Sequence, residues 1–208
     1  HRPRAGCRAR PALLADPRVH PALGLHPWHV PADLDAALLR LEALIDETSP
    51  AAIGETGLDR SRRGAPRPLQ EQAFRAQIAL ARDRELPLIL HVVRSHGACL
   101  AALSAASFTR GGMVHDFAGP GETVRDWTRA GFYLSLSPRS ARKPALLAAV
   151  PDHSLLAETD DAGPEALPAL LSAIADARQT TPEAIAHLTH QNALRLLGSG
   201  VSLSASGG

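Results

Sequence analysis

The sequence has few cysteines, few aromatic residues and almost no net charge. Its 208 residues include two cysteines, Cys7 and Cys99, which form neither a disulfide framework nor a metal-binding spacing. A reduced, cytoplasmic compartment is therefore the expected location. With 22 basic and 21 acidic residues the net charge is +1, so no overall field selects a polyanionic partner. Aromatic residues make up 3% of the chain, which argues against extensive stacking on nucleic-acid bases.

Three sequence signals are also missing. No apolar run approaches the roughly 18 residues of a membrane span, so we expect no membrane partner. No secretory signal opens the chain, which begins at His1 with a basic stretch that we expect to be irregular over residues 1–20. No Gly-x-Gly-x-x-Gly follows the first apolar run, so a dinucleotide-binding fold has little support.

Six short apolar runs alternate with segments of helical period. The runs are PALGLHPW, AAIGETGLD, LPLILHVV, GGMVHDFAG, GFYLSLSP and SLLAETDD. A typical intervening segment, residues 31–48, places one apolar face at Leu34, Leu38, Leu41, Leu44 and Ile45. The last segment begins at Thr181, a predicted N-cap, and ends at Gly198. The alternation predicts an α/β fold with a parallel sheet whose strands are covered on both faces.

The six predicted strands end in polar residues at regular intervals. These ends are His26, Glu55, His91, His115, Ser135 and Asp160. They lie roughly 20 to 36 residues apart, near the roughly 30 residues of a βα unit. A TIM-type (β/α) barrel is favoured, although such barrels usually have about 250 residues and eight strands. We therefore predict one domain over residues 1–208, an incomplete barrel with about six of the eight strands.

Four of these strand ends carry residues that bind metals. In a barrel the carboxyl ends of the strands face the active-site mouth, so Glu55, His91, His115 and Asp160 are predicted to meet there. Two imidazoles and two carboxylates suit divalent cations, and Glu55 has two oxygens with which to bridge two ions. Gly54 and Gly57 are expected to let the backbone turn tightly beside Glu55. One such residue alone is more often a hydrogen-bonded surface group; four equivalent ones favour a metal site.

Other polar residues have simpler interpretations. Asp59 is predicted to cap the turn after Glu55 in preference to a catalytic role, and Trp28 and Trp127 are predicted to pack in the core or at its rim. Arg94 either holds an anionic substrate at the mouth or is a solvated loop residue. The remaining histidines of turns and helices are predicted to lie on the surface: His20, His29, His96, His153, His187 and His190.

The motifs together resemble the TatD family of metal-dependent hydrolases, whose best-known activity is deoxyribonuclease. The matching segments are GLHPW, AIGETGLD, LPLILHVVR, GGMVHDFAG, LLAETDD and NALRLLG. They occur in the family's order and cover the chain from about Pro21 to Gly198. The resemblance implies a (β/α) barrel that binds one or two divalent cations, Mg²⁺, Mn²⁺ or Zn²⁺.

The resemblance also assigns roles to individual residues. Glu55 matches the family's bridging glutamate, and His91 and His115 match the two histidines that hold one cation with it. Asp160 matches an aspartate that binds the other cation and assists the attacking water, which makes it, with Glu55, a predicted catalytic residue. His26 matches a histidine beside the site that is suited to the substrate phosphate.

Two parts of the family pattern are missing. The family begins with a strand that bears a His-x-His pair, and His1 lies too close to His26 to precede such a strand and its helix. We therefore expect the first two strands to be absent. After Asp160, the segment ETDDAGPEALPALL runs almost directly into a helix where the family has a long loop. An open barrel exposes two sheet edges, which favours self-association, while the oligomeric state stays open.

The expected function is exonuclease-type cleavage of phosphodiester bonds in DNA, impaired by the missing strands. Four arginines, Arg60, Arg62, Arg63 and Arg67, lie where a DNA backbone could pass, although loop arginines are more often merely solvated. Two alternatives stay open. The chain could hydrolyse a small ester, amide or phosphate, or it could be an inactive barrel remnant.

Overall fold

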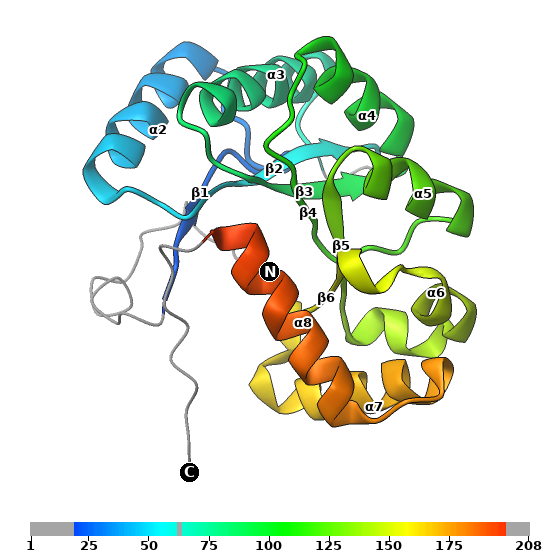
Figure 1. Cartoon of the computed structure of the whole chain (residues 1–208). Coiled ribbons are helices and arrows are strands. Elements are labelled where there is room, and N and C mark those ends of the chain that lie inside the picture. Colours follow the sequence, from blue (N-terminus) through cyan, green and yellow to red (C-terminus); the bar gives the residue numbers. More distant parts are fainter. Residues whose placement is uncertain (1–18, 62–63, 199–208) are drawn as a thin grey trace.

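The computed structural model describes residues 19–61 and 64–198, which form a curved parallel sheet surrounded by helices (Figure 1). The six strands pair in sequence order from β1 to β6, and all pairs are parallel. They are β1 (Ala22–Leu23), β2 (Ala52–Asp59), β3 (Leu88–Val93), β4 (Gly112–Val114), β5 (Phe132–Leu136) and β6 (Leu155–Ala157). Within the described residues β1 does not pair with β6, so the barrel is open, as predicted. Residues 1–18 of the predicted irregular end lie outside the described ranges.

Helices follow the strands and, apart from the last one, lie along the outer side of the sheet (Figure 1). They are α2 (Leu34–Thr48), α3 (Arg67–Asp83), α4 (His96–Ala105), α5 (Gly121–Arg129), α6 (Pro144–Ala149), α7 (Leu167–Arg178) and α8 (Pro182–Leu197). Four short 3₁₀ turns complete the chain: η1 (Pro138–Arg142), η2 (Asp152–Ser154), η3 (Asp160–Ala162) and η4 (Pro164–Ala166). Over the described ranges, none of these helices has the length and apolar character needed to cross a membrane.

Local sequence explains where the helices begin and end. The hydroxyl of Thr181 accepts a hydrogen bond from the backbone N–H of Ala184 at 3.2 Å, and Gly198 ends α8 with a φ of 86°. Both predictions for this helix are confirmed. In α2 the apolar face was predicted partly wrongly, because Leu44 is 47% exposed while Ala37 takes a buried place.

The core lies between the sheet and its helices. Strand residues such as Ile53, Leu90 and Leu134 are fully buried, and so is Trp127 of α5, as predicted. The inner side of the sheet is covered by α8 (Figure 1). The C-terminal turns of α8 and residues of the strands together line a small apolar cavity of about 180 Å³. Apolar side chains are therefore needed on both faces of each strand, which explains the continuous apolar runs.

The region around Glu55 differs from the prediction of a turn. β2 continues past Glu55 and pairs with β3 up to Asp59, with a shift of register between Ile53 and Thr56. Gly57 lies opposite His91 with a φ of 134°, and a Cβ there would lie 2.2 Å from the carbonyl oxygen of His91. Gly57 is thus required for close strand pairing and not for a turn. Glu55 and His91 both lie within strands.

Candidate metal centre

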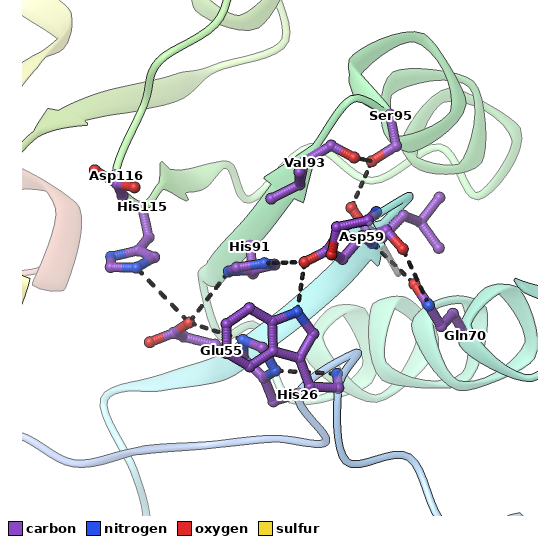
Figure 2. Close-up of polar contacts among 12 residues, drawn as sticks. His26, Glu55, Asp59, Gln70, His91, Val93, Ser95, His115 and Asp116 are labelled. Carbon is purple, nitrogen blue, oxygen red and sulfur yellow. Dashed lines mark hydrogen bonds and ion pairs between the residues drawn. The ribbon is translucent and has the colours of Figure 1, made fainter. Parts of the chain in front are cut away.

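Three imidazole rings surround one carboxylate oxygen of Glu55 (Figure 2). Oε2 of Glu55 lies 3.5 Å from Nε2 of His26, 3.8 Å from Nδ1 of His91 and 3.9 Å from Nε2 of His115. His26 follows β1, Glu55 and His91 belong to β2 and β3, and His115 follows β4. Four neighbouring strands therefore bring one carboxylate and three rings to the same point. Of the predicted site residues, Glu55, His91 and His115 meet as expected.

The donor atoms fit a divalent cation. Two ligands bonded to one ion at about 2.1 Å with tetrahedral geometry lie about 3.4 Å apart, close to the separations around Glu55. Ligand atoms of His26, Glu55 and His91 all lie within 4.8 Å of one another. Two side chains at the centre are largely covered, since His91 is 14% and His115 12% exposed, while Glu55 is 37% exposed. The group thus offers nitrogen and oxygen ligands with one side open to solvent.

Asp59 holds the far side of the His91 ring (Figure 2). Its Oδ2 lies 3.0 Å from Nε2 of His91, and its carboxylate also accepts hydrogen bonds from the indole of Trp28 and the backbone N–H of Ser61. Burial raises the pKa of Asp59, but these hydrogen bonds outweigh it and lower the pKa to about 2. Asp59 caps its turn through Ser61, as predicted. It also leaves Nδ1 of His91 directed at Glu55, a role that sequence reasoning missed.

Glu158 holds the ring of His115 in the way that Asp59 holds the ring of His91. Its Oε1 lies 2.8 Å from Nδ1 of His115 and accepts a hydrogen bond of 2.6 Å from the backbone N–H of Asp116. Burial lowers the pKa of His115, but the hydrogen bond and charge of Glu158, with the charges of Glu55 and Asp160, raise it to about 9. The ring is therefore protonated at neutral pH until a cation displaces that proton. Glu158 belongs to the ETD motif, yet only Asp160 of that motif was selected from the sequence.

His26 was predicted to lie beside the site and contact the substrate phosphate, but it lies within the centre itself. Burial and the neighbouring rings of His91 and His29 lower its pKa to about 4, so it is neutral and able to act as a ligand. Its ring contacts Trp28 edge-on, with centroids 5.1 Å apart. Trp28 is 37% exposed and packs at the rim, as predicted.

Asp160 and Arg94 lie at the edge of the centre. Asp160 was predicted to end the sixth strand, but β6 ends at Ala157, so Asp160 stands on η3, three residues beyond the observed strand end. Its Oδ1 lies 3.9 Å from Nε2 of His115. Arg94 directly follows β3 with a φ of 52°, and its side chain is exposed. Two arginines of the predicted basic loop, Arg62 and Arg63, lie outside the described residues.

Two buried glutamines of α3 fix the backbone beside the centre. Gln70 accepts from the backbone N–H of Asp59 at 2.8 Å and donates to its carbonyl at 3.1 Å (Figure 2). One heptad later, Gln77 accepts from the backbone N–H of Leu25 at 2.7 Å, next to His26. Sequence reasoning missed both, although glutamines on the apolar face of a predicted helix are a usable signal of such buried hydrogen bonds.

Two surface predictions among the remaining histidines are wrong. His96 is half-buried, and its Nδ1 accepts a hydrogen bond of 3.0 Å from the indole of Trp127, while burial lowers its pKa. His20 is also half-buried. The other four, which are exposed, confirm the prediction: His29, His153, His187 and His190.

Comparison with known proteins gives this chain a family. The family described as TatD related DNase matches residues 9–198. The chain is 30% identical over 196 residues to the uncharacterized metal-dependent hydrolase YabD of Bacillus subtilis, covering 86% of this chain and 77% of that protein. It is 33% identical over 175 residues to the 3'-5' ssDNA/RNA exonuclease TatD of Cronobacter sakazakii, covering 81% of this chain and 66% of the exonuclease.

A solved structure supports the same fold. The crystal structure of YjjV, a TatD homologue from Escherichia coli K12, superposes with a TM-score of 0.76 at 26% sequence identity. The match covers 85% of this chain and 76% of YjjV. The chain thus spans about two thirds to three quarters of the proteins it resembles.

Proposed function

The chain belongs to the TatD family of metal-dependent hydrolases, and from that premise we propose that it removes nucleotides from single-stranded DNA by phosphodiester hydrolysis. The observation that carries the proposal is the convergence of three imidazole nitrogens on Oε2 of Glu55. The printed name of the Cronobacter relative, a 3'-5' ssDNA/RNA exonuclease, supports the choice of substrate. A cytoplasmic location and self-association through the open sheet edges stay predictions from the sequence.

Glu55, His91 and His115 are the proposed cation ligands, with His26 within reach as a further one. Imidazole nitrogens favour Zn²⁺ or Mn²⁺ over Mg²⁺. A cation bound there would polarise a phosphoryl oxygen and lower the pKa of a bound water. Asp59 and Glu158 keep the rings of His91 and His115 turned so that one nitrogen of each faces Glu55.

Asp160 is the proposed acceptor for the proton of the attacking water. Its Oδ1 lies beside the His115 ring and at the open side of the centre, where a water between protein and substrate has access. The role of Asp160 as a ligand, with Glu55, for a second cation stays a prediction from the sequence. Arg94 is the proposed contact for the substrate phosphate, because its exposed guanidinium follows the strand that carries His91.

The decisive experiment is cleavage of a 5'-labelled single-stranded oligonucleotide in the presence of Mn²⁺. We expect a ladder of shortened products that disappears with a chelator and in Glu55→Gln, while the exposed-histidine control His190→Ala retains wild-type rates. Rates should fall with salt, because the substrate backbone is charged.

Other results would redirect the assignment. Unchanged Mn²⁺-dependent cleavage in Glu55→Gln would contradict the proposed roles. Hydrolysis of chromogenic esters without cleavage of single-stranded DNA would instead identify a small-molecule hydrolase. A chain that binds no cation would be an inactive barrel remnant.

A further inference from the structure

Arg139 connects two carboxylates at the open side of the metal centre. It lies on η1, directly after β5, and one terminal nitrogen of its guanidinium contacts Oδ2 of Asp160 at 2.5 Å and Oδ2 of Asp116 at 2.6 Å. Asp116 follows His115 at the end of β4, and Asp160 follows β6. The arginine therefore spans the two strands on either side of its own.

The contacts of Arg139 complete a closed chain of polar contacts that begins and ends at His115. Nδ1 of His115 meets Glu158, whose Oε1 accepts from the backbone N–H of Asp116. The carboxylate of Asp116 meets Arg139, Arg139 meets Asp160, and Oδ1 of Asp160 returns to Nε2 of His115 at 3.9 Å. The other side chains in this closed chain of contacts are partly buried, whereas Arg139 is 67% exposed. Apart from His115, Arg139 is the one positively charged member.

The backbone around η1 fixes Arg139 in this position. The hydroxyl of Ser137, which is fully buried, donates to Oδ1 of Asp116 and accepts from the backbone N–H of Arg139 at 3.2 Å. Asp116 thereby uses one oxygen for Ser137 and the other for Arg139. Arg139 thus contacts Asp116 directly through its side chain, and its backbone is linked to Asp116 through the Ser137 hydroxyl.

We propose that Arg139 is the fixed positive partner of Asp160, so that it orients this carboxylate and makes it a poor ligand for a second divalent cation. This inference rests on the proposed role of Asp160 in hydrolysis. With Oδ2 held by the guanidinium, Oδ1 stays beside His115 at the open side of the centre. The permanent positive charge of the guanidinium repels a second cation. It also neutralises part of the negative charge of Asp160 and Asp116 that would otherwise attract that cation.

Cation binding without substrate tests the proposal. We would measure Mn²⁺ stoichiometry and affinity by calorimetry for the wild type, Arg139→Gln and a matched control, Arg142→Gln, an exposed arginine of the same η1 turn. We expect about one ion for the wild type and the control, and an additional weaker ion in Arg139→Gln, because two freed carboxylates can then bind a cation. That ion should be lost in Arg139→Gln/Asp160→Asn.

Two binding results would overturn the proposal. One is wild-type stoichiometry and affinity in Arg139→Gln. The other is a loss of tenfold or more in the affinity of the first ion in Asp160→Asn alone, which would make Asp160 a ligand already in the wild type.

Stability and kinetics separate this proposal from the proposed function. A double-mutant cycle on thermal unfolding between Arg139→Gln and Asp160→Asn needs neither ion nor substrate, and we expect a non-additive shift in the unfolding midpoint; additive shifts would overturn the pairing. If the chain cleaves DNA, Arg139→Gln should lower kcat with little change in KM, and millimolar guanidinium should partly restore Arg139→Ala. A raised KM with unchanged kcat would assign Arg139 to substrate binding and overturn its positioning role.

Discussion

The two halves of the metal centre are built differently. The strand half, His26, Glu55, Asp59 and His91, is supported by β2, β3 and the buried glutamines of α3. The loop half, His115, Asp116, Glu158, Arg139 and Asp160, lies almost entirely on segments that follow strands, and Asp116 and Asp160 both have positive φ angles. Backbone pairing fixes the first half, whereas charged side chains fix the second. We therefore expect both halves to supply cation ligands, the strand half to contribute more to fold stability, and the loop half to determine the charge and proton transfer around the cation.

The largest difference between the halves should come from the two carboxylates that hold histidines. Asp59→Asn and Glu158→Gln should each weaken Mn²⁺ binding by roughly 10- to 100-fold, because each ring loses the partner that orients it. Asp59 is 2% exposed and also binds Trp28 and Ser61, so its replacement should lower the free energy of unfolding as well, by about 1–3 kcal/mol. Calorimetric titration and chemical unfolding of both variants measure the two effects. Equal losses of stability in the two variants would contradict the difference between the halves.

The two halves should also lose stability at opposite ends of the pH range when no cation is bound. The pKa of Asp59 is lowered to about 2, so its stabilising contribution is present above pH 4 and is lost as the pH falls toward 2. The pKa of His115 is raised to about 9, so its contribution is present below pH 6.5 and is lost as the pH rises toward 9. Chemical unfolding with a chelator at each pH measures both slopes. We expect Asp59→Asn to flatten only the acid slope and Glu158→Gln only the alkaline one.

A smaller effect should follow from the glutamines behind the strand half. Gln77→Ala removes the side chain that binds the backbone of Leu25, leaving buried polar groups without partners and lowering the free energy of unfolding by about 1–3 kcal/mol. Gln72, exposed on the same helix, is the matched control, and Gln72→Ala should change stability by less than about 0.5 kcal/mol. Because Leu25 adjoins His26, cation affinity should fall modestly in Gln77→Ala alone. Equal unfolding midpoints for the two variants would show that α3 does not support the centre.

The smallest expected effect concerns the cysteine packed behind β2. Cys99 is fully buried, and burial raises the pKa of its thiol to about 12 despite hydrogen bonds from its surroundings. In a Cys7→Ala variant, a thiol reagent should therefore label Cys99 only as fast as the protein unfolds. Labelling in native buffer, followed by mass spectrometry, measures this rate. Rapid labelling would mean that the strand half opens locally and is less rigid than its hydrogen bonds indicate.

The sequence predicted the strands and helices where periodicity carries the information. The six apolar runs became the six strands, and Thr181 and Gly198 bound α8 as expected, because caps and buried faces are local properties. The turn at Glu55 was wrong, since pairing of Gly57 with His91 extends β2 to Asp59. That pairing is a tertiary contact, and glycine suits both a turn and a close approach of two strands.

The centre of the site was also largely predictable, but its support was not. Glu55, His91 and His115 could be chosen because three metal-binding residues occur at corresponding places in successive βα units. Asp59 and Glu158 could not be assigned to His91 and His115 from the sequence. Each pairing depends on the orientation of the imidazole ring, which decides which of its two nitrogens faces the carboxylate. Arg139 gave no sequence signal at all: an exposed arginine after a strand resembles any solvated loop residue until its two acidic partners are placed.

The most direct test of the account is anomalous diffraction from crystals soaked with Mn²⁺. We predict one strong peak within bonding distance, about 2.1–2.3 Å, of Oε2 of Glu55 and of ring nitrogens of His91 and His115, with the Arg139 guanidinium still between Asp116 and Asp160. A peak between Asp116 and Asp160, or no peak near Glu55, would contradict the claim that Glu55, His91 and His115 hold the cation.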